Sequence, residues 1–251
     1  MVESDLHTHT LYSDGSASLE EMVRSALSLG VKKLGISDHG YTSFDESYCM
    51  KKSAVSSYLR EIGALKEKYK GEIEILAGVE WDLFSEGDIK AFDYAIGSVH
   101  YLKVGGEYIP VDESPSLLVS ACEKYFSGDF YALTDRYYQE VAALADIPTV
   151  SIVGHFDLIK KFNEKEKLFP ESDPRYVASW KRAADALLQK RKAFEINTGA
   201  MHRGYLSTPY PSKNVFEYLK EQGAKFTFGS DSHSPSTIGF LPPETEREYG
   251  L

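Results

Sequence analysis

Short apolar runs recur along the chain, and each is followed by polar residues and then by a stretch with helical periodicity. The runs span residues 5–10, 33–39, 74–81, 94–100, 149–155, 193–199 and 225–231. Many of them carry β-branched or aromatic residues, and several end at glycine or at a polar residue. This pattern is typical of buried strands in a parallel sheet.

The segments between the runs have recognisable helix ends. Ser18 and Glu21 have the spacing of a capping box, and Gly30 follows the last apolar residue of that helix. Ser114 followed by Pro115 predicts another helix start, and Gly128 ends that helix. Further helices are expected at 54–70, 130–146, 174–192 and 213–222, whereas 43–50, 104–114 and 204–212 are expected to be loops that follow strand ends.

Strands that alternate with helices predict βαβ units and hence a parallel sheet. Seven such runs favour a closed or nearly closed α/β barrel with parallel strands. We expect residues 1–251 to form it as one domain, since this length is ordinary for a single barrel domain. An open, doubly wound sheet is the alternative.

Histidines concentrate at the predicted strand ends. The chain has 7 histidines, and all except His202 lie at or near the carboxyl end of a run: His7, His9, His39, His100, His155 and His233. Acidic residues occupy further strand ends, namely Asp38, Glu80, Glu195 and Asp231. In parallel barrels this face carries the active site.

Several buried imidazoles and carboxylates in one place require compensating cations. Neutral imidazole together with carboxylate, without cysteine, suits Zn, Mn or Fe better than Ca or Mg. His7 and His9 are two residues apart on a strand and therefore face the same side, and Asp231 and His233 repeat that spacing. The donors outnumber those that one ion needs, so we expect two to three divalent metal ions.

Charge and hydropathy exclude other classes of partner. The formal net charge of −10 argues against nonspecific binding of nucleic acid. No apolar run approaches the roughly 20 residues that span a bilayer, and no basic, apolar leader precedes His7. We therefore expect a cytoplasmic protein that acts on a small molecule, neither on nucleic acid nor at a membrane.

Seven motifs together resemble the PHP (polymerase and histidinol phosphatase) superfamily along essentially the whole chain, and within it the monofunctional histidinol-phosphate phosphatases. The motifs are DLHTHTLYSDG, ISDHG, GVEWD, YAIGSVHYL, VGHFDLI, EINT and GSDSH. The resemblance implies a distorted (β/α)7 barrel with a trinuclear metal centre. It also implies that a metal-bound hydroxide hydrolyses L-histidinol phosphate, in histidine biosynthesis, without a covalent phosphoenzyme.

By the same resemblance the metal ligands fall into three sets. His7, His9, Glu80 and Asp231 would hold the first ion; Glu80, His100 and His155 the second; and Asp14, His39 and His233 the third. Some members of the superfamily have histidine near the position of Asp14, which makes weaker binding at the third site an expectation. Glu80, Asp231 and His233 are the expected catalytic residues.

Residues outside the ligand sets are candidates for binding the substrate. Arg203 and Lys160 are expected to bind phosphate, and Lys161 is expected at the surface. Glu195 either contacts the ammonium group of the substrate or supports a metal-binding histidine. Two other functions stay open: a PHP phosphatase or phosphodiesterase for another substrate, such as phosphotyrosine protein or nucleotides, and a catalytically inactive domain.

Overall fold

The predicted parallel barrel is present in the computed structural model, which describes residues 2–250. Strands run parallel in one sheet in the order β1-β2-β3-β4-β7-β8-β9, which apart from an inserted hairpin is the order of the chain. Their bounds are β1 (Ser4–Asp5), β2 (Lys33–Ile36), β3 (Glu74–Asp82), β4 (Tyr94–Ser98), β7 (Ile152–Val153), β8 (Ala193–Asn197) and β9 (Phe226–Gly229). Each lies within or across one of the apolar runs.

The first and last strands meet and nearly close the barrel. The Leu6 N–H donates to the Phe228 carbonyl at 3.1 Å, and beyond the strands Thr8 and Ser232 form a parallel bridge. The buried Asp5 carboxylate supports this seam, because it accepts hydrogen bonds from the Ser230 N–H at 3.0 Å and from the Gly239 N–H at 2.8 Å. The open doubly wound sheet is therefore wrong. A single domain over 1–251 stays a prediction, which the adjacency of β1 and β9 supports; residues 1 and 251 lie outside the described part.

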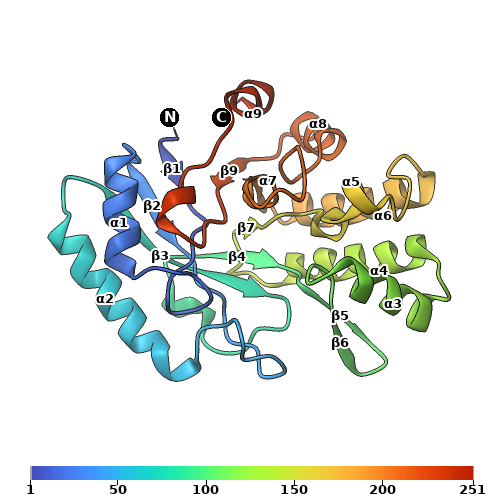
Figure 1. Cartoon of the computed structure of the whole chain (residues 1–251), viewed down its shortest axis with the longest axis horizontal. Coiled ribbons are helices and arrows are strands. Elements are labelled where there is room, and N and C mark those ends of the chain that lie inside the picture. The colour runs from blue at the N-terminus through green and yellow to red at the C-terminus, as the bar shows by residue number, and fades with distance from the viewer. Residues whose placement is uncertain (1, 251) are drawn as a thin grey trace.

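Helices cover the outside of the sheet (Figure 1). Helix α1 packs on β2 and helix α2 on β3, and Met22, Ile62, Leu34 and Ile36 belong to one hydrophobic core; a second, larger core lies beneath α3, α4, α6 and α8. The bounds are α1 (Leu19–Ser28), α2 (Val55–Lys68), α3 (Pro115–Phe126), α4 (Phe130–Ala143), α5 (Asn163–Glu166), α6 (Pro174–Gln189), α7 (Gly199–His202), α8 (Lys213–Glu221) and α9 (Pro243–Tyr249).

The helix ends follow the predicted chemistry. The Ser18 side chain accepts from the Glu21 N–H while the Glu21 carboxylate accepts from the Ser18 N–H, so that the capping box is complete. Gly30 has a φ of +77°, which a side-chain-bearing residue adopts only with strain. Ser114 caps α3, and Pro115 occupies its first turn.

One predicted loop is wrong. Residues within 104–114 were expected to be irregular, but β5 (Tyr101–Val104) and β6 (Glu107–Pro110) form an antiparallel hairpin. Gly105 and Gly106 make its turn with φ values of 61° and 86°. Two glycines with positive φ are the signature of a tight hairpin turn, so the Gly-Gly pair was the signal that could have identified it.

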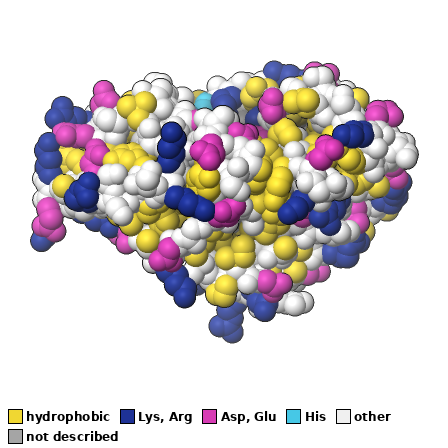
Figure 2. Space-filling view, turned by 90° about the horizontal axis from the view of Figure 1, so that it is seen from below, with side chains coloured by type: hydrophobic (Ala, Val, Ile, Leu, Met, Phe, Trp, Pro, Cys, Tyr) yellow, Lys and Arg dark blue, Asp and Glu magenta, His cyan; other side chains and the backbone are white. Residues whose placement is uncertain are grey.

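One face of the outer surface carries mixed charge. On the face drawn in Figure 2, Lys, Arg, Asp and Glu side chains are interspersed around apolar ones, instead of forming a block of one sign. Within residues 2–250, no helix combines the length and the hydrophobicity needed to cross a bilayer.

Candidate metal centre

All of the predicted metal-binding residues come together at the carboxyl ends of the strands. His39 follows β2, Glu80 lies in β3, His100 follows β4 and His155 follows β7. The other members come from the stretches after β1 and β9. His7, His9 and Glu80 are at most 1% exposed, whereas Asp14 is exposed and His233 is half-buried, so the site has a buried inner part and an open outer part.

The Glu80 carboxylate lies at the middle of the cluster. Its Oε2 is 3.1 Å from His7 Nε2 and 3.0 Å from His39 Nδ1, and its Oε1 is 2.8 Å from His155 Nε2 and 3.3 Å from His100 Nε2. Burial alone would raise the pKa of Glu80, but the surrounding imidazoles His7, His39 and His100 outweigh burial and hold this pKa well below its usual range. Glu80 therefore stays ionised and can face more than one cation.

His7, His9 and Glu80 form a first group whose donor atoms lie within 4.8 Å of one another. Asp231 adjoins this group, since its Oδ1 is 3.4 Å from His9 Nε2 and 4.0 Å from His7 Nε2. Asp231 has a φ of +54°, a left-handed conformation that costs free energy for a residue with a side chain. Such strain is common where a structure aims a functional group.

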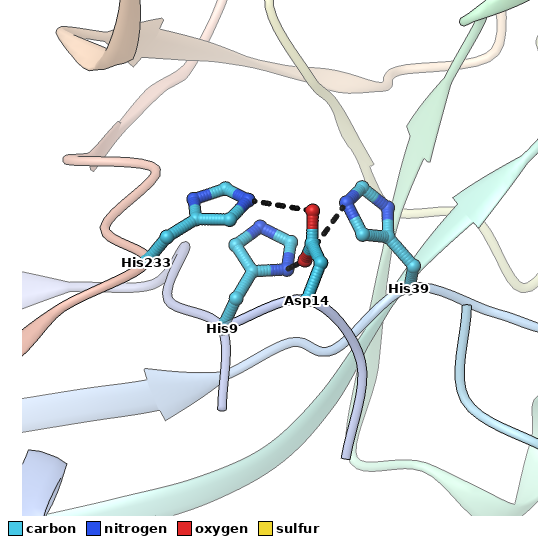
Figure 3. A group of neighbouring side chains, drawn as sticks. All are labelled: His9, Asp14, His39 and His233. Carbon is cyan, nitrogen blue, oxygen red and sulfur yellow. Dashed lines mark ion pairs between the residues drawn. The ribbon is translucent and has the colours of Figure 1, made fainter. Parts of the chain in front are cut away.

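The third predicted set forms a second compact group around Asp14 (Figure 3). Its Oδ2 is 3.2 Å from His233 Nε2, and its Oδ1 is 3.7 Å from His39 Nε2 and 3.9 Å from His9 Nδ1. Burial alone would raise the pKa of Asp14, but the neighbouring His39 and the hydrogen bond from His233 outweigh burial and hold this pKa below its usual value. The structure adds His9 to the three residues that the sequence assigned to this site.

A further group consists of His39, Glu80 and His100, again with donor atoms within 4.8 Å. The predicted second set has His155 in place of His39. His155 contacts the same Glu80 oxygen as His100, and the two rings lie edge to face at 5.0 Å. Glu80 is therefore shared between groups, as a bridging carboxylate would be.

The chemistry of these donors fits divalent ions. Buried ring nitrogens of four histidines have no hydrogen-bond partner, namely His7 Nε2, both nitrogens of His9, His100 Nδ1 and His155 Nδ1. A buried polar atom without a partner is costly, and nitrogen lone pairs beside carboxylates are the donors that Zn, Mn and Fe take. Burial and the neighbouring His233 and His39 lower the pKa of His9 to about 3, so this ring stays neutral and able to ligate.

Two acidic residues orient the histidines from behind. Glu195 Oε1 lies 2.6 Å from His7 Nδ1, while Oε2 accepts from the backbone N–H of His155 at 3.0 Å. Glu195 does not line the cavity above the centre, so its geometry favours the supporting role over contact with a substrate ammonium. Asp82, which the sequence analysis missed, accepts from the backbone N–H of His100 at 2.8 Å. Its spacing of two residues from Glu80 in a strand was the available signal.

A cavity of about 630 Å³ opens above these groups. Arg203 lines it and places a guanidinium nitrogen 2.7 Å from Asp231 Oδ2. Of the two neighbouring lysines, Lys161 and not Lys160 lies at the cavity, and Lys160 is buried elsewhere. Lys161 lines the cavity and donates to the Asp112 carbonyl at 2.7 Å, whereas Lys160 lies outside it with Nζ 3.4 Å from Glu171.

The chain belongs to the PHP domain family, whose model matches residues 5–199. It is 26% identical to the histidinol-phosphatase of Bacillus subtilis over 96% of this chain and 97% of that protein. It is 29% identical to the "Probable histidinol-phosphatase" of Deinococcus radiodurans over 97% of this chain and 91% of that protein.

Two solved structures share the fold. The HisK protein of Listeria monocytogenes matches with a TM-score of 0.81 and 22% identity, covering 94% of this chain and 97% of that one. Histidinol phosphate phosphatase of Lactococcus lactis, complexed with Zn, L-histidinol and phosphate, matches with a TM-score of 0.63 and 21% identity, covering 98% and 90%.

We expect the Glu195→Gln substitution to weaken metal binding about 10- to 100-fold, because the amide cannot hold His7 as a carboxylate does. The measurement is a zinc competition titration against a chelator of known affinity. Glu140→Gln is the matched control, since Glu140 is also buried but lies on α4, bonded to Arg136. Equal zinc affinities of the two variants would contradict the supporting role of Glu195.

Proposed function

We propose that this chain hydrolyses L-histidinol phosphate to L-histidinol and phosphate, as a step of histidine biosynthesis. The observation that carries the proposal is the set of overlapping donor groups around Glu80 at the floor of one cavity, with Arg203 and Lys161 in its walls. The relatives named histidinol-phosphatase, which align over nearly their whole length, support this choice of substrate. The Lactococcus lactis neighbour holds Zn, L-histidinol and phosphate.

In this proposal three ligand sets hold divalent ions, with Zn, Mn or Fe as the candidates. Glu80 is shared between the first two sets, and Asp14 belongs to the third. When bound, the ions would lower the pKa of a water molecule and neutralise the phosphoryl oxygens. The sets are His7, His9, Glu80 and Asp231; Glu80, His100 and His155; and Asp14, His39 and His233.

The chain itself positions the phosphate ester. The Arg203 guanidinium already binds Asp231 and lies 3.3 Å from His233 Nδ1, so that it faces the groups that would surround the phosphoryl oxygens. Lys161 replaces Lys160 as the second cation, because Asp112 holds its Nζ at the cavity wall and leaves donor capacity for an anion. Glu80, Asp231 and His233 are the catalytic residues of the proposal, since they line the floor. A cytoplasmic location is part of the same proposal.

Steady-state kinetics on several phosphate esters test the substrate. We expect kcat/KM for L-histidinol phosphate to exceed that for phosphotyrosine and for p-nitrophenyl phosphate by at least about 100-fold. A site whose polar groups hydrogen-bond to the substrate strongly rejects esters that lack the matching groups. Prolonged chelation should abolish turnover, and added Zn or Mn should restore it. A preference for phosphotyrosine, or full activity of metal-free protein, would contradict the proposal.

The two neighbouring lysines provide a matched pair of variants. Lys161→Met should lower kcat/KM for L-histidinol phosphate about 10- to 100-fold, mainly through KM, because a hydrogen bond to a charged group is lost while the aliphatic stem stays. Lys160→Met should change it less than about three-fold, since Lys160 pairs with Glu171 outside the cavity. Kinetics in which Lys160→Met has the larger effect would show that the phosphate lies elsewhere.

A further inference from the structure

One wall of the cavity is aromatic and is built by two segments that are distant in sequence. The loop 41–51, between β2 and α2, contributes Tyr48, whose ring meets the His39 ring edge to face at 4.9 Å and stacks with Tyr101 of β5 at 6.1 Å. Behind them Phe44 stacks on Tyr108 of β6 with a centroid distance of 3.8 Å. These contacts fasten the loop to the hairpin, so the wall is a formed surface.

Asp45 is the charged group of this wall. Its Oδ2 accepts from the Tyr101 hydroxyl at 2.8 Å, and its Oδ1 accepts from the N–H of Ser47 at 3.0 Å and from its hydroxyl at 2.6 Å. Partial burial raises the pKa of Asp45, but these hydrogen bonds from Ser47 and Tyr101 outweigh burial and lower it. The carboxylate is therefore fixed in position and ionised, and it lines the cavity.

The other acidic side chains of the cavity already have a role or lack a fixed place. Asp14, Glu80 and Asp231 belong to the donor groups, and Asp112 holds Lys161. Glu113 is exposed. Within residues 2–250, Asp45 is the cavity carboxylate that is held by several hydrogen bonds and yet has no Lys, Arg or His partner, so it lacks a counter-charge.

We propose that Asp45 determines substrate specificity by accepting a hydrogen bond from the imidazole of the alcohol, with Tyr48 and Tyr101 as the surface for the ring. This inference rests on the proposed function. The donor groups, Arg203 and Lys161 attract the phosphate to one end of the cavity. In L-histidinol phosphate the imidazole is the end of the molecule farthest from phosphorus, and the aromatic wall leads from His39 to Asp45.

The arrangement also accounts for rejection of other esters. An aromatic ring packs well against tyrosine faces whatever its substituents, so the tyrosines alone would accept a nitrophenyl or a phosphotyrosine ring. These rings have no N–H to offer, so they would take the ionised Asp45 out of water without adding a donor to those of Tyr101 and Ser47. Removing water from a charged group without a replacement donor is costly, and a site of this kind discriminates strongly against the analogue that lacks the donor.

Kinetics of Asp45→Asn on two substrates test the inference. We expect kcat/KM for L-histidinol phosphate to fall about 10- to 100-fold, mainly through KM. The loss for p-nitrophenyl phosphate should be at least about ten times smaller. The inhibition constant of L-histidinol should rise in parallel. Tyr101→Phe, which removes a hydrogen bond from Asp45 and keeps the ring, should show a weaker form of the same selective loss.

Glu46→Gln is the matched control, because this substitution removes the same charge from the same loop. The Glu46 carboxylate accepts a hydrogen bond from the Tyr41 hydroxyl at the surface. We expect its kinetics on both substrates to stay within about two-fold of the parent. If Asp45→Asn lowers kcat/KM equally for both substrates, or does not lower it for L-histidinol phosphate, the role of Asp45 is overturned and the proposed function is not. If the parent protein itself does not prefer L-histidinol phosphate, the proposed function fails and this inference fails with it.

Discussion

The contact of one buried carboxylate, Glu80, with imidazoles from four different strand ends is the constraint on which the rest of the site depends. Glu80 is 1% exposed, and its oxygens lie 2.8–3.3 Å from nitrogens of His7, His39, His100 and His155. A negative charge in such a place is stable only beside cations. Divalent ions would supply that charge, because ring nitrogens of His7, His100 and His155 have no hydrogen-bond partner and suit such ions.

The barrel is what allows this concentration of polar groups. Each strand delivers its last side chains to one face, and the seam between β1 and β9 brings the first and last of them together, so that Asp231 lies beside His9. Close backbone approach is part of the construction. A Cβ on Gly229 would lie 1.9 Å from Glu195 Oε1, and one on Gly199 would lie 2.5 Å from Asp231 Oδ2. Both glycines are needed where the supporting carboxylate and the left-handed Asp231 are placed.

The sequence predicted the fold and the gathering of the candidate ligand residues, because strand ends of a parallel barrel converge wherever the intervening helices go. Features set by short-range geometry escaped it. Lys160 ends a 3₁₀ turn, Leu158–Lys160, and successive side chains in such a turn point about 120° apart. Lys160 and Lys161 therefore point in different directions, although they are adjacent in the sequence. The hairpin β5–β6 interrupts the βα alternation. The position of the Asp45 carboxylate depends on its hydrogen bond from Tyr101 of that hairpin, so the sequence around Asp45 did not identify it as a candidate.

The most direct measurement of the central claim is anomalous X-ray diffraction from crystals grown with Zn, recorded on both sides of the zinc absorption edge. The account predicts anomalous peaks within the donor groups around Glu80, with one peak between His7 and His9 and another beside His100 and His155. The peak beside Asp14 should be the weakest. Zinc-loaded crystals that show no anomalous peak within reach of the Glu80 carboxylate would contradict the account.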